Sequence, residues 1–249
     1  MLAVIIMAAG KGKRMESELP KVLHLLVGRP FIDYVLDAAS VLCADTTVVV
    51  IGHKREQVRD HLDGRGVQFV VQDPPLGTGH AVLQAEPILA GFTDDIVVLS
   101  GDVPLIQRTT LARLVEIHQQ RRNTATVLTT IVENPTGYGR IVRDEKGVFA
   151  AIVEEREASA EVRQVREINS GIYVFDSTEL FDYIKQIRPD NRKGEYYLTD
   201  LIEIMIKAGK RVEAHPVAAF WEVRGINTKL ELREAEREYQ TMTQRPKNY

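Results

Sequence analysis

Residues 2–15 read LAVIIMAAGKGKRM, an unbroken apolar run that passes into two glycines and three basic side chains. A short run rich in β-branched residues predicts a strand over residues 2–7 that is covered on both faces, as in a parallel sheet. Gly10 and Gly12 then permit a sharp turn with exposed backbone N–H groups, which suits phosphate binding. The stretch therefore predicts the first strand of an α/β sheet, with a phosphate loop at its carboxyl end.

Further short apolar runs follow, separated by segments with helical periodicity. The predicted strands cover residues 47–51, 67–71, 96–99, 125–132 and 172–175, and the predicted helices cover residues 31–42, 55–62, 79–89, 110–120, 179–187 and 198–208. This alternation predicts an α/β fold of three layers, with a Rossmann-like, mostly parallel sheet and right-handed crossovers. Shorter segments at residues 139–142, 148–153 and 172–175 indicate an added small β region, which we interpret as a lid or substrate half.

The bulk composition excludes several classes of protein. The chain has 249 residues, of which 44% are hydrophobic and 27% charged, as expected of a globular protein. Its net charge of -3 argues against a general nucleic-acid binder, which is usually strongly basic. The single cysteine, Cys43, allows no internal disulfide, and no run reaches the roughly 18 apolar residues that a membrane span needs. We therefore predict a cytoplasmic protein that binds neither nucleic acid nor membranes.

Two common phosphate loops do not fit residues 8–15. The dinucleotide-binding fingerprint requires a third glycine where the chain has Met15, which also disfavours an NAD-dependent dehydrogenase. The P-loop pattern requires a glycine five residues before the Gly-Lys pair and Ser or Thr after it, but Ile5 and Gly12 occupy those positions. An ordinary basic surface turn is the remaining structural alternative.

Residues 72–81, QDPPLGTGHA, follow a predicted strand and open a predicted helix. The amide of Gln72 offers a donor and an acceptor, as one edge of uracil requires, and Gly77 permits close approach of the backbone. The alternative is structural, because Thr78 is a suitable N-cap for the helix. We interpret His80 as a packed helix residue rather than an acid–base group.

Residues 96–105, IVVLSGDVPL, place one carboxylate, Asp102, at the end of an apolar strand. The carboxyl ends of strands are where α/β sheets bind ligands, and Mg²⁺ takes only one or two protein oxygens beside substrate phosphates. The alternative is an Asp that caps the helix at residues 110–120. Asn227, taken alone, also reads as a helix cap.

The run at residues 8–15 and the PKVL at residues 20–23 resemble the signature loop of nucleoside-diphosphate-sugar pyrophosphorylases. Residues 72–81 resemble, almost letter for letter, the uracil-reading run of the bacterial N-acetylglucosamine-1-phosphate uridyltransferases. The chain departs from its relatives at Lys13, where they usually carry Ser or Thr, and at Ser100, where they often carry an aromatic residue. The resemblance spans nearly the whole chain and implies the nucleotide-diphospho-sugar transferase fold.

The resemblance also implies a role for each matching residue. Catalysis falls to Arg14 and Lys21, which would steady the charge that develops at phosphorus, and Mg²⁺ ligation falls to Asp102 and Asn227. Nucleotide binding is implied for Ala8, Ala9, Gly10, Gly12, Lys21, Gln72, Gly77 and Thr78, and binding of the sugar phosphate for Gly101, Gly139, Glu154, Asn169 and Asn227. Residues 194–200 resemble the family's lid.

The activity implied is the synthesis of UDP-N-acetylglucosamine, a peptidoglycan precursor, from UTP and N-acetylglucosamine 1-phosphate. The reaction would be a Mg²⁺-assisted in-line attack on the α-phosphorus that releases pyrophosphate. A sister enzyme with another hexose or nucleotide stays open. So does a non-catalytic nucleotide-sugar binding protein, although such a protein would be expected to lack Lys21 or Asp102.

The domain organisation follows from the same resemblance. A nucleotidyltransferase domain is expected over residues 1–227, followed by a C-terminal helix and tail at residues 228–249. The bifunctional relatives carry an acetyltransferase β-helix with hexapeptide repeats, and this chain shows none, so we expect no acetyl transfer. Homo-oligomerisation is left open.

Overall fold

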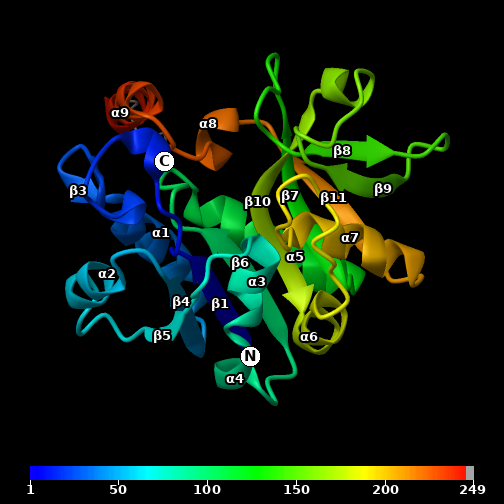
Figure 1. Ribbon diagram of the computed structural model, residues 1–249, viewed down its shortest axis with the longest axis horizontal. Helices are drawn as coiled ribbons and strands as arrows, with labels where there is room; N and C mark the ends of the chain where they lie inside the picture. Colours follow the sequence, from blue (N-terminus) through cyan, green and yellow to red (C-terminus); the bar gives the residue numbers. More distant parts are fainter. Residues whose placement is uncertain (245–249) are drawn as a thin grey trace.

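The structure is a computed structural model that describes residues 1–244, so the end of the predicted tail, residues 245–249, lies outside the described residues. Strand β1 (Leu2–Met7) lies near the centre of the sheet, between β4 (Thr46–Ile51) and β6 (Asp95–Ser100), and pairs with both in parallel (Figure 1). Strand β5 (Gln68–Val71) extends this parallel half at the edge beside β4. All these strands match their predicted ranges to within two residues.

The other half of the sheet mixes strand directions. Strand β10 (Glu167–Asp176) lies antiparallel between β6 and β7 (Ala125–Ile131), and β11 (Val212–Val217) pairs in parallel with β7. The sequence analysis did not predict β11. Its polar composition and Pro216 obscure the strand pattern, and both are tolerated because β11 is an edge strand.

The added β region predicted from the sequence is a hairpin. It consists of β8 (Arg140–Arg143) and β9 (Phe149–Val153), and β8 joins the sheet through the start of β10. Residues 172–175, which we had grouped with this region, instead lie in the main sheet, because they pair with both β6 and β7.

Helices cover both faces of the sheet, which confirms the three layers. Alternate residues of β1 point to opposite sides, so Ala3 and Ile5 belong to one hydrophobic cluster while Val4 and Ile6 belong to the other. The first cluster includes α3 (Thr78–Leu83), α6 (Ser177–Ile184) and α7 (Leu198–Lys207). The second includes α1 (Phe31–Ala39), α2 (Arg55–His61) and α5 (Arg108–Arg121).

One predicted helix is divided in the structure. The range 79–89 forms α3 and a separate α4 (Glu86–Leu89), because Pro87 has no N–H to donate and its ring would collide with the carbonyl four residues earlier. Two further helices follow β11, namely α8 (Phe220–Val223) and α9 (Lys229–Gln244). Helix α9 covers most of the predicted C-terminal helix and tail, while the boundary at residue 227 stays a prediction. Among residues 1–244, no helix combines the length and the apolar character needed to cross a membrane.

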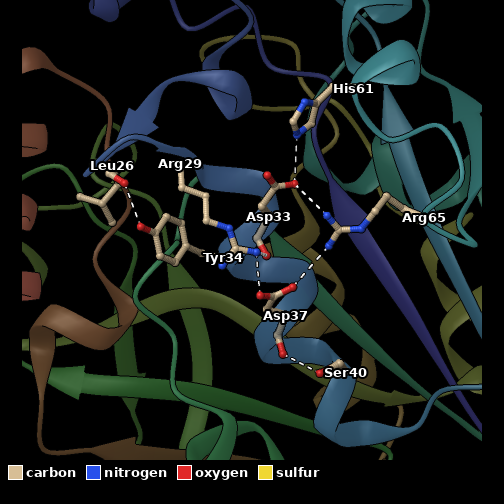
Figure 2. Close-up of polar contacts among 8 residues, drawn as sticks. All are labelled: Leu26, Arg29, Asp33, Tyr34, Asp37, Ser40, His61 and Arg65. Carbon is tan, nitrogen blue, oxygen red and sulfur yellow. Dashed lines mark hydrogen bonds and ion pairs between the residues drawn. The ribbon is translucent and has the colours of Figure 1, made fainter. Parts of the chain in front are cut away.

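A polar network fixes α1 against α2 and the segment after it (Figure 2). The buried Asp33 Oδ1 lies 3.0 Å from His61 Nε2 and 3.4 Å from Arg65 Nη1. Asp37, one turn further along α1, accepts from Arg29 at 2.6 Å and from Arg65 at 3.3 Å. Helix α1 also packs against the turn that begins at Lys21, so the network stabilises the support of the site described next.

Candidate functional site

A cavity of about 670 Å³ opens at the carboxyl ends of β1 and β6, between the parallel half and the hairpin region. Ten of the predicted site residues line it: Ala8, Ala9, Gly10, Arg14, Lys21, Gln72, Gly77, Thr78, Asp102 and Glu154. The other five predicted residues are not in its wall: Gly12, Gly101, Gly139, Asn169 and Asn227. Four of them lie next to residues that are, and Asn169 hydrogen-bonds to Gly139. The structure therefore places both groups at one end of the sheet.

The phosphate loop bends back on itself directly after β1. Gly12 adopts a φ of 58° and begins a short 3₁₀ turn (Lys13–Met15) whose Met15 side chain is buried. A Cβ at Gly12 would lie 2.9 Å from the Cβ of Lys21, so a side chain at Gly12 would collide with the base of the Lys21 side chain. Gly12 thus packs against Lys21 and does not line the cavity.

Lys21, Asp102, Asn227 and Arg14 form one polar cluster, although they come from distant parts of the chain. The Lys21 ammonium donates to Asp102 Oδ2, and it donates to Asn227 Oδ1 at 2.6 Å. Arg14 Nη2 donates to the same Asn227 oxygen at 2.9 Å. The structure therefore brings together the two predicted catalytic residues and the two predicted metal ligands.

Asp102 is held in place by the backbone around it. The Gly101 N–H donates to Met7 O at 3.0 Å, and a Cβ at Gly101 would lie 2.9 Å from Val22 Cγ1, so only glycine fits. Burial opposes ionisation of Asp102, but the charge of Lys21 and hydrogen bonds from Lys21 and Ser100 outweigh it, so its pKa lies below the ordinary value. Asp102 is thus a carboxylate at neutral pH. Its main-chain carbonyl accepts a hydrogen bond from the N–H of Ile226 at 2.9 Å, which ties it to the segment before Asn227.

The cluster suits a divalent cation. Within residues 1–244 there is no group of three or more His, Cys, Asp or Glu side chains that could hold a metal alone. Asp102 Oδ2 and Asn227 Oδ1 nevertheless converge on one positive charge, the Lys21 ammonium. Two oxygen ligands beside substrate phosphates are the arrangement that Mg²⁺ accepts in proteins. The residues present therefore fit this ion.

The predicted uracil-reading segment is held by contacts across the cavity. The buried Gln72 amide donates to Gly77 O at 2.8 Å and lies 3.3 Å from His80 Nδ1. Gly77 adopts a φ of 116°, and a Cβ there would lie 2.5 Å from the carbonyl oxygen of Tyr196. His80 also contacts Gln84, and burial lowers its pKa, which agrees with the packing role expected for it.

The structural alternative for Thr78 is wrong. Thr78 lies in the first turn of α3, where Gly77 is the N-cap residue and no side chain caps the helix. The Thr78 hydroxyl instead accepts from the Leu198 N–H at 2.9 Å, at the first residue of α7. It thereby joins the nucleotide-side loop to the helix on the opposite side of the cavity.

The predicted sugar-binding residues meet beside the hairpin β8–β9. Asn169 N–H donates to Gly139 O at 2.9 Å, and a Cβ at Gly139 would lie 3.6 Å from Glu154 Oε1. Asn169 is oriented by its own contacts, since Nδ2 donates to the Tyr173 hydroxyl at 2.7 Å and Oδ1 accepts from Gly171 N at 3.0 Å. The Gly139 turn therefore lies beside the side chains of Glu154 and Asn169.

Thr199 is a residue whose part in the site the sequence analysis missed. Its hydroxyl donates to Glu154 Oε1 at 3.1 Å. Burial raises the pKa of Glu154, and this hydrogen bond opposes the rise. The sequence showed Thr199 only as a member of the lid stretch, because its partner lies 45 residues away.

A second missed group supports the turn at residues 137–139. The buried Arg140 donates to Glu155 Oε2 at 2.6 Å and to the Tyr138 carbonyl, and Glu155 also accepts from the Gly137 N–H at 3.1 Å. A fully buried Arg needs such a partner, but a strand pattern does not reveal which one. Further cavity residues that the sequence did not single out as site residues are Ser100, Arg156, Lys193, Glu195 and Tyr197.

Comparison with known proteins gives one family and consistent relatives. The family model described as nucleotidyl transferase matches residues 3–230. "Bifunctional protein GlmU" of Pelotomaculum thermopropionicum is 47% identical over 236 residues, which are 95% of this chain and 51% of the relative. The protein of the same name from Listeria innocua is 44% identical over 231 residues, covering 93% and 50%. The chain thus spans about half the length of the curated relatives it matches.

A solved structure shows the same fold. The structure described as UDP-glucose pyrophosphorylase complexed with UDP-glucose superposes with a TM-score of 0.79 and 21% sequence identity, covering 96% of this chain and 98% of that one. This likeness confirms the nucleotide-diphospho-sugar transferase fold expected from the sequence.

Proposed function

This chain belongs to the nucleotidyl transferase family, and we propose that it is the uridylyltransferase that makes UDP-N-acetylglucosamine and pyrophosphate from UTP and N-acetylglucosamine 1-phosphate. The name of its relatives, GlmU, covers this activity. The observation that carries the proposal is the convergence of Lys21, Asp102, Asn227 and Arg14 at one end of the cavity. UDP-N-acetylglucosamine would serve cell-wall synthesis, and the cytoplasmic location remains a prediction.

The chemistry requires positioning and charge neutralisation more than a protein nucleophile. A phosphate oxygen of the sugar phosphate attacks the α-phosphorus of UTP, a new P–O bond forms, and the bond to the β-phosphate oxygen breaks as pyrophosphate leaves. Negative charge grows on the oxygens of the leaving group. Lys21 and Arg14 would neutralise it, because both cations line the cavity at the carboxyl end of β1.

Family members generally use Mg²⁺, and in this chain Asp102 and Asn227 would hold it. When bound, the ion would supply positive charge that draws the phosphate oxygens together. Lys21 contacts Asp102 Oδ2 and Asn227 Oδ1 in the structure, so with an ion held by these oxygens its ammonium would be available to the phosphates. Lys21 would then neutralise substrate charge instead of protein charge.

The opposite end of the cavity would bind the sugar. The Glu154 carboxylate can accept from two neighbouring sugar hydroxyls, and the Asn169 amide can both donate and accept. The turn at Gly139 lies beside both side chains, and its backbone groups would be available to the ring. These three residues are a proposed sugar subsite, with the phosphate of the sugar directed toward Lys21.

A pyrophosphate-release assay tests the proposal. The full chain is incubated with Mg²⁺, UTP and N-acetylglucosamine 1-phosphate, and in parallel with glucose 1-phosphate or with CTP, ATP and GTP. We expect kcat/KM to be highest for UTP with N-acetylglucosamine 1-phosphate, by about tenfold or more, because a lost polar partner leaves site groups unpaired. A higher value for glucose 1-phosphate or another nucleotide would identify a sister enzyme, and no turnover with any pair would indicate a non-catalytic binding protein.

A further inference from the structure

Helix α9 begins at Lys229, two residues after Asn227, and the first turn of the helix accepts a hydrogen bond from the backbone of Asn227. Glu231 Oε2 accepts from the main-chain N–H of Asn227 at 2.6 Å and from that of Thr228 at 2.9 Å. In return, the Thr228 hydroxyl accepts from the Glu231 N–H at 3.2 Å. This reciprocal pattern is a capping box, extended by one residue to include Asn227.

The orientation of this backbone decides where the Asn227 side chain points. Asn227 Oδ1 receives both Lys21 and Arg14, while Nδ2 donates to the Gly225 carbonyl at 3.2 Å. The preceding residue, Ile226, is tied to the Asp102 carbonyl at 2.9 Å. Asn227 is therefore fixed on one side by the strand end that carries Asp102 and on the other side by Glu231.

Helix α9, which carries Glu231, is itself fixed by packing against α1. Its Leu232, Ala235 and Tyr239 belong to a hydrophobic cluster with Leu26 and with Phe31, the first residue of α1. The rings of Tyr239 and Tyr34 pack edge to face, 5.6 Å apart. The helix is thus anchored to the same α1 that supports Lys21.

We propose that Glu231 is a positioning residue that acts through Asn227 on the divalent-cation site. It touches neither substrate nor cation; it holds the backbone from which one of the two oxygen ligands projects. The inference rests on the proposed function in one respect, the assignment of the cation to Asp102 and Asn227. It also makes the first turn of α9 part of the active centre, although the sequence analysis had placed that helix after the nucleotidyltransferase domain.

Binding of the Mn²⁺–UTP complex to the full chain tests the proposal without turnover. Water-proton relaxation reports the protein-bound Mn²⁺, and the sugar phosphate is omitted so that no product forms. Glu231→Ala should weaken binding about tenfold or more, as is usual when the partner of a metal ligand is removed. Glu231→Gln should stay close to the wild type, because its amide oxygen can still accept from both N–H groups. The matched control Glu238→Ala removes an exposed carboxylate from the same helix and should also stay close to the wild type.

A double-mutant cycle separates positioning from general destabilisation. If Glu231 acts through Asn227, Glu231→Ala should have no further effect on Mn²⁺–UTP binding in an Asn227→Ala background, since contacting residues couple and independent ones add. All variants are compared at a temperature at which thermal melting shows each to be folded.

Three results would overturn the proposal. They are equal binding by Glu231→Ala and Glu238→Ala, equal losses for Glu231→Ala and Glu231→Gln, and additive losses in the cycle. If the wild type binds Mn²⁺–UTP and the variants behave as expected while no nucleotide sugar forms in the activity assay, the proposed function fails and this inference stands.

Discussion

The two ends of the cavity are built in different ways. One end carries Lys21 and Asp102, and we call it the phosphate end after its proposed role. It rests on buried parallel strands, and its shape comes from backbone groups such as the Gly101 N–H bound to Met7 and the turn at Gly12. The other end carries Glu154 and Asn169, and we call it the sugar end after its proposed role. It rests on the hairpin β8–β9, the start of β10 and the segment before α7. Its shape comes from side chains, namely Glu154 with Thr199 and Arg140 with Glu155.

The difference fits the two functions that we propose for these ends. A backbone scaffold at buried strand ends holds charge in a fixed place, which suits stabilisation of a transition state. Side-chain contacts on a hairpin and a loop can be exchanged without disturbing the sheet, which suits recognition of different sugars. The contact between Gly77 and Tyr196 joins the two ends. Changes at the phosphate end should therefore alter kcat, and changes at the sugar end should alter the KM for the sugar phosphate.

The largest effect is expected for Lys21→Ala. Its kcat should fall by about 10²-fold or more, roughly 3 kcal/mol, because a preorganised cation at the growing charge is lost. Steady-state kinetics with saturating UTP and sugar phosphate measure it. Lys13→Ala is the control, since Lys13 is an exposed cation of the same loop and its kcat should stay near the wild-type value. An unchanged kcat in Lys21→Ala would remove Lys21 from the mechanism.

Gly77→Ala tests the junction between the two ends. The new Cβ would meet the Tyr196 carbonyl at 2.5 Å with φ held at 116°, so the free energy of unfolding should fall by about 2 kcal/mol or more. Urea denaturation measures the loss. Gly64→Ala is the control for φ alone, because Gly64 has a φ of 73° but open space around it, and should cost roughly 1 kcal/mol. Equal losses in the two variants would mean that the collision is relieved and the junction is loose.

Glu154→Gln tests the sugar end. The KM for N-acetylglucosamine 1-phosphate should rise about tenfold with little change in kcat, since one charged hydrogen-bond acceptor is replaced by a neutral one. Binding of UTP, measured by calorimetry, should not change. Glu145→Gln, at the exposed turn of the same hairpin, should leave both constants unaltered. A fall in kcat without a change in KM would contradict the division of roles between the two ends.

The smallest effect concerns Asp200, in the first turn of α7. Burial, and then the charges of Glu154, Glu203 and Glu157, raise its pKa to about 6. The folded state therefore holds this proton more tightly than the unfolded state does, and stability is lost as the pH rises from the unfolded pKa through the folded one. Asp200→Asn should increase the free energy of unfolding by about 1 kcal/mol at about pH 7.5 and by nothing near pH 4, after allowance for the partial exposure of the carboxyl group.

Urea denaturation at the two pH values checks this. The exposed Asp182 on α6 provides the control substitution, Asp182→Asn, which should show no such pH dependence. A gain for Asp200→Asn that is equal at both pH values would show that the carboxyl group is not responsible.

The sequence predicted the parallel half of the fold in detail, and it singled out the residues that gather at the carboxyl ends of β1 and β6. Strands such as β1 and β6 are unbroken runs of Val, Ile and Leu, and the glycines after β1 have few other uses, so local pattern is sufficient there. It did not predict β11, whose half-buried edge position tolerates polar residues and Pro216. Nor could it place 172–175 correctly, because pairing with β6 and β7 is a long-range property.

The contacts that complete the site were beyond the reach of sequence patterns. Thr78 looks like a cap for its own helix and instead serves α7. Glu231 looks like one more carboxylate on a charged helix and instead holds Asn227. In each case the residue type was compatible with an ordinary local role, and only the spatial arrangement shows which partner it has.

Lys21 and Asn227 share a hydrogen bond although they lie far apart in the sequence, and this separation has a consequence for synthesis of the protein. The two residues are 206 positions apart, whereas the central strands β1, β4 and β6 all come from the first hundred. During translation, the middle of the sheet can therefore form before residue 227 has been made, since chains fold from the amino terminus as they emerge. Lys21 can meet Asp102 early, but its hydrogen bond to Asn227 can form only after residue 227 has been made, so the polar cluster is completed later than the middle of the sheet.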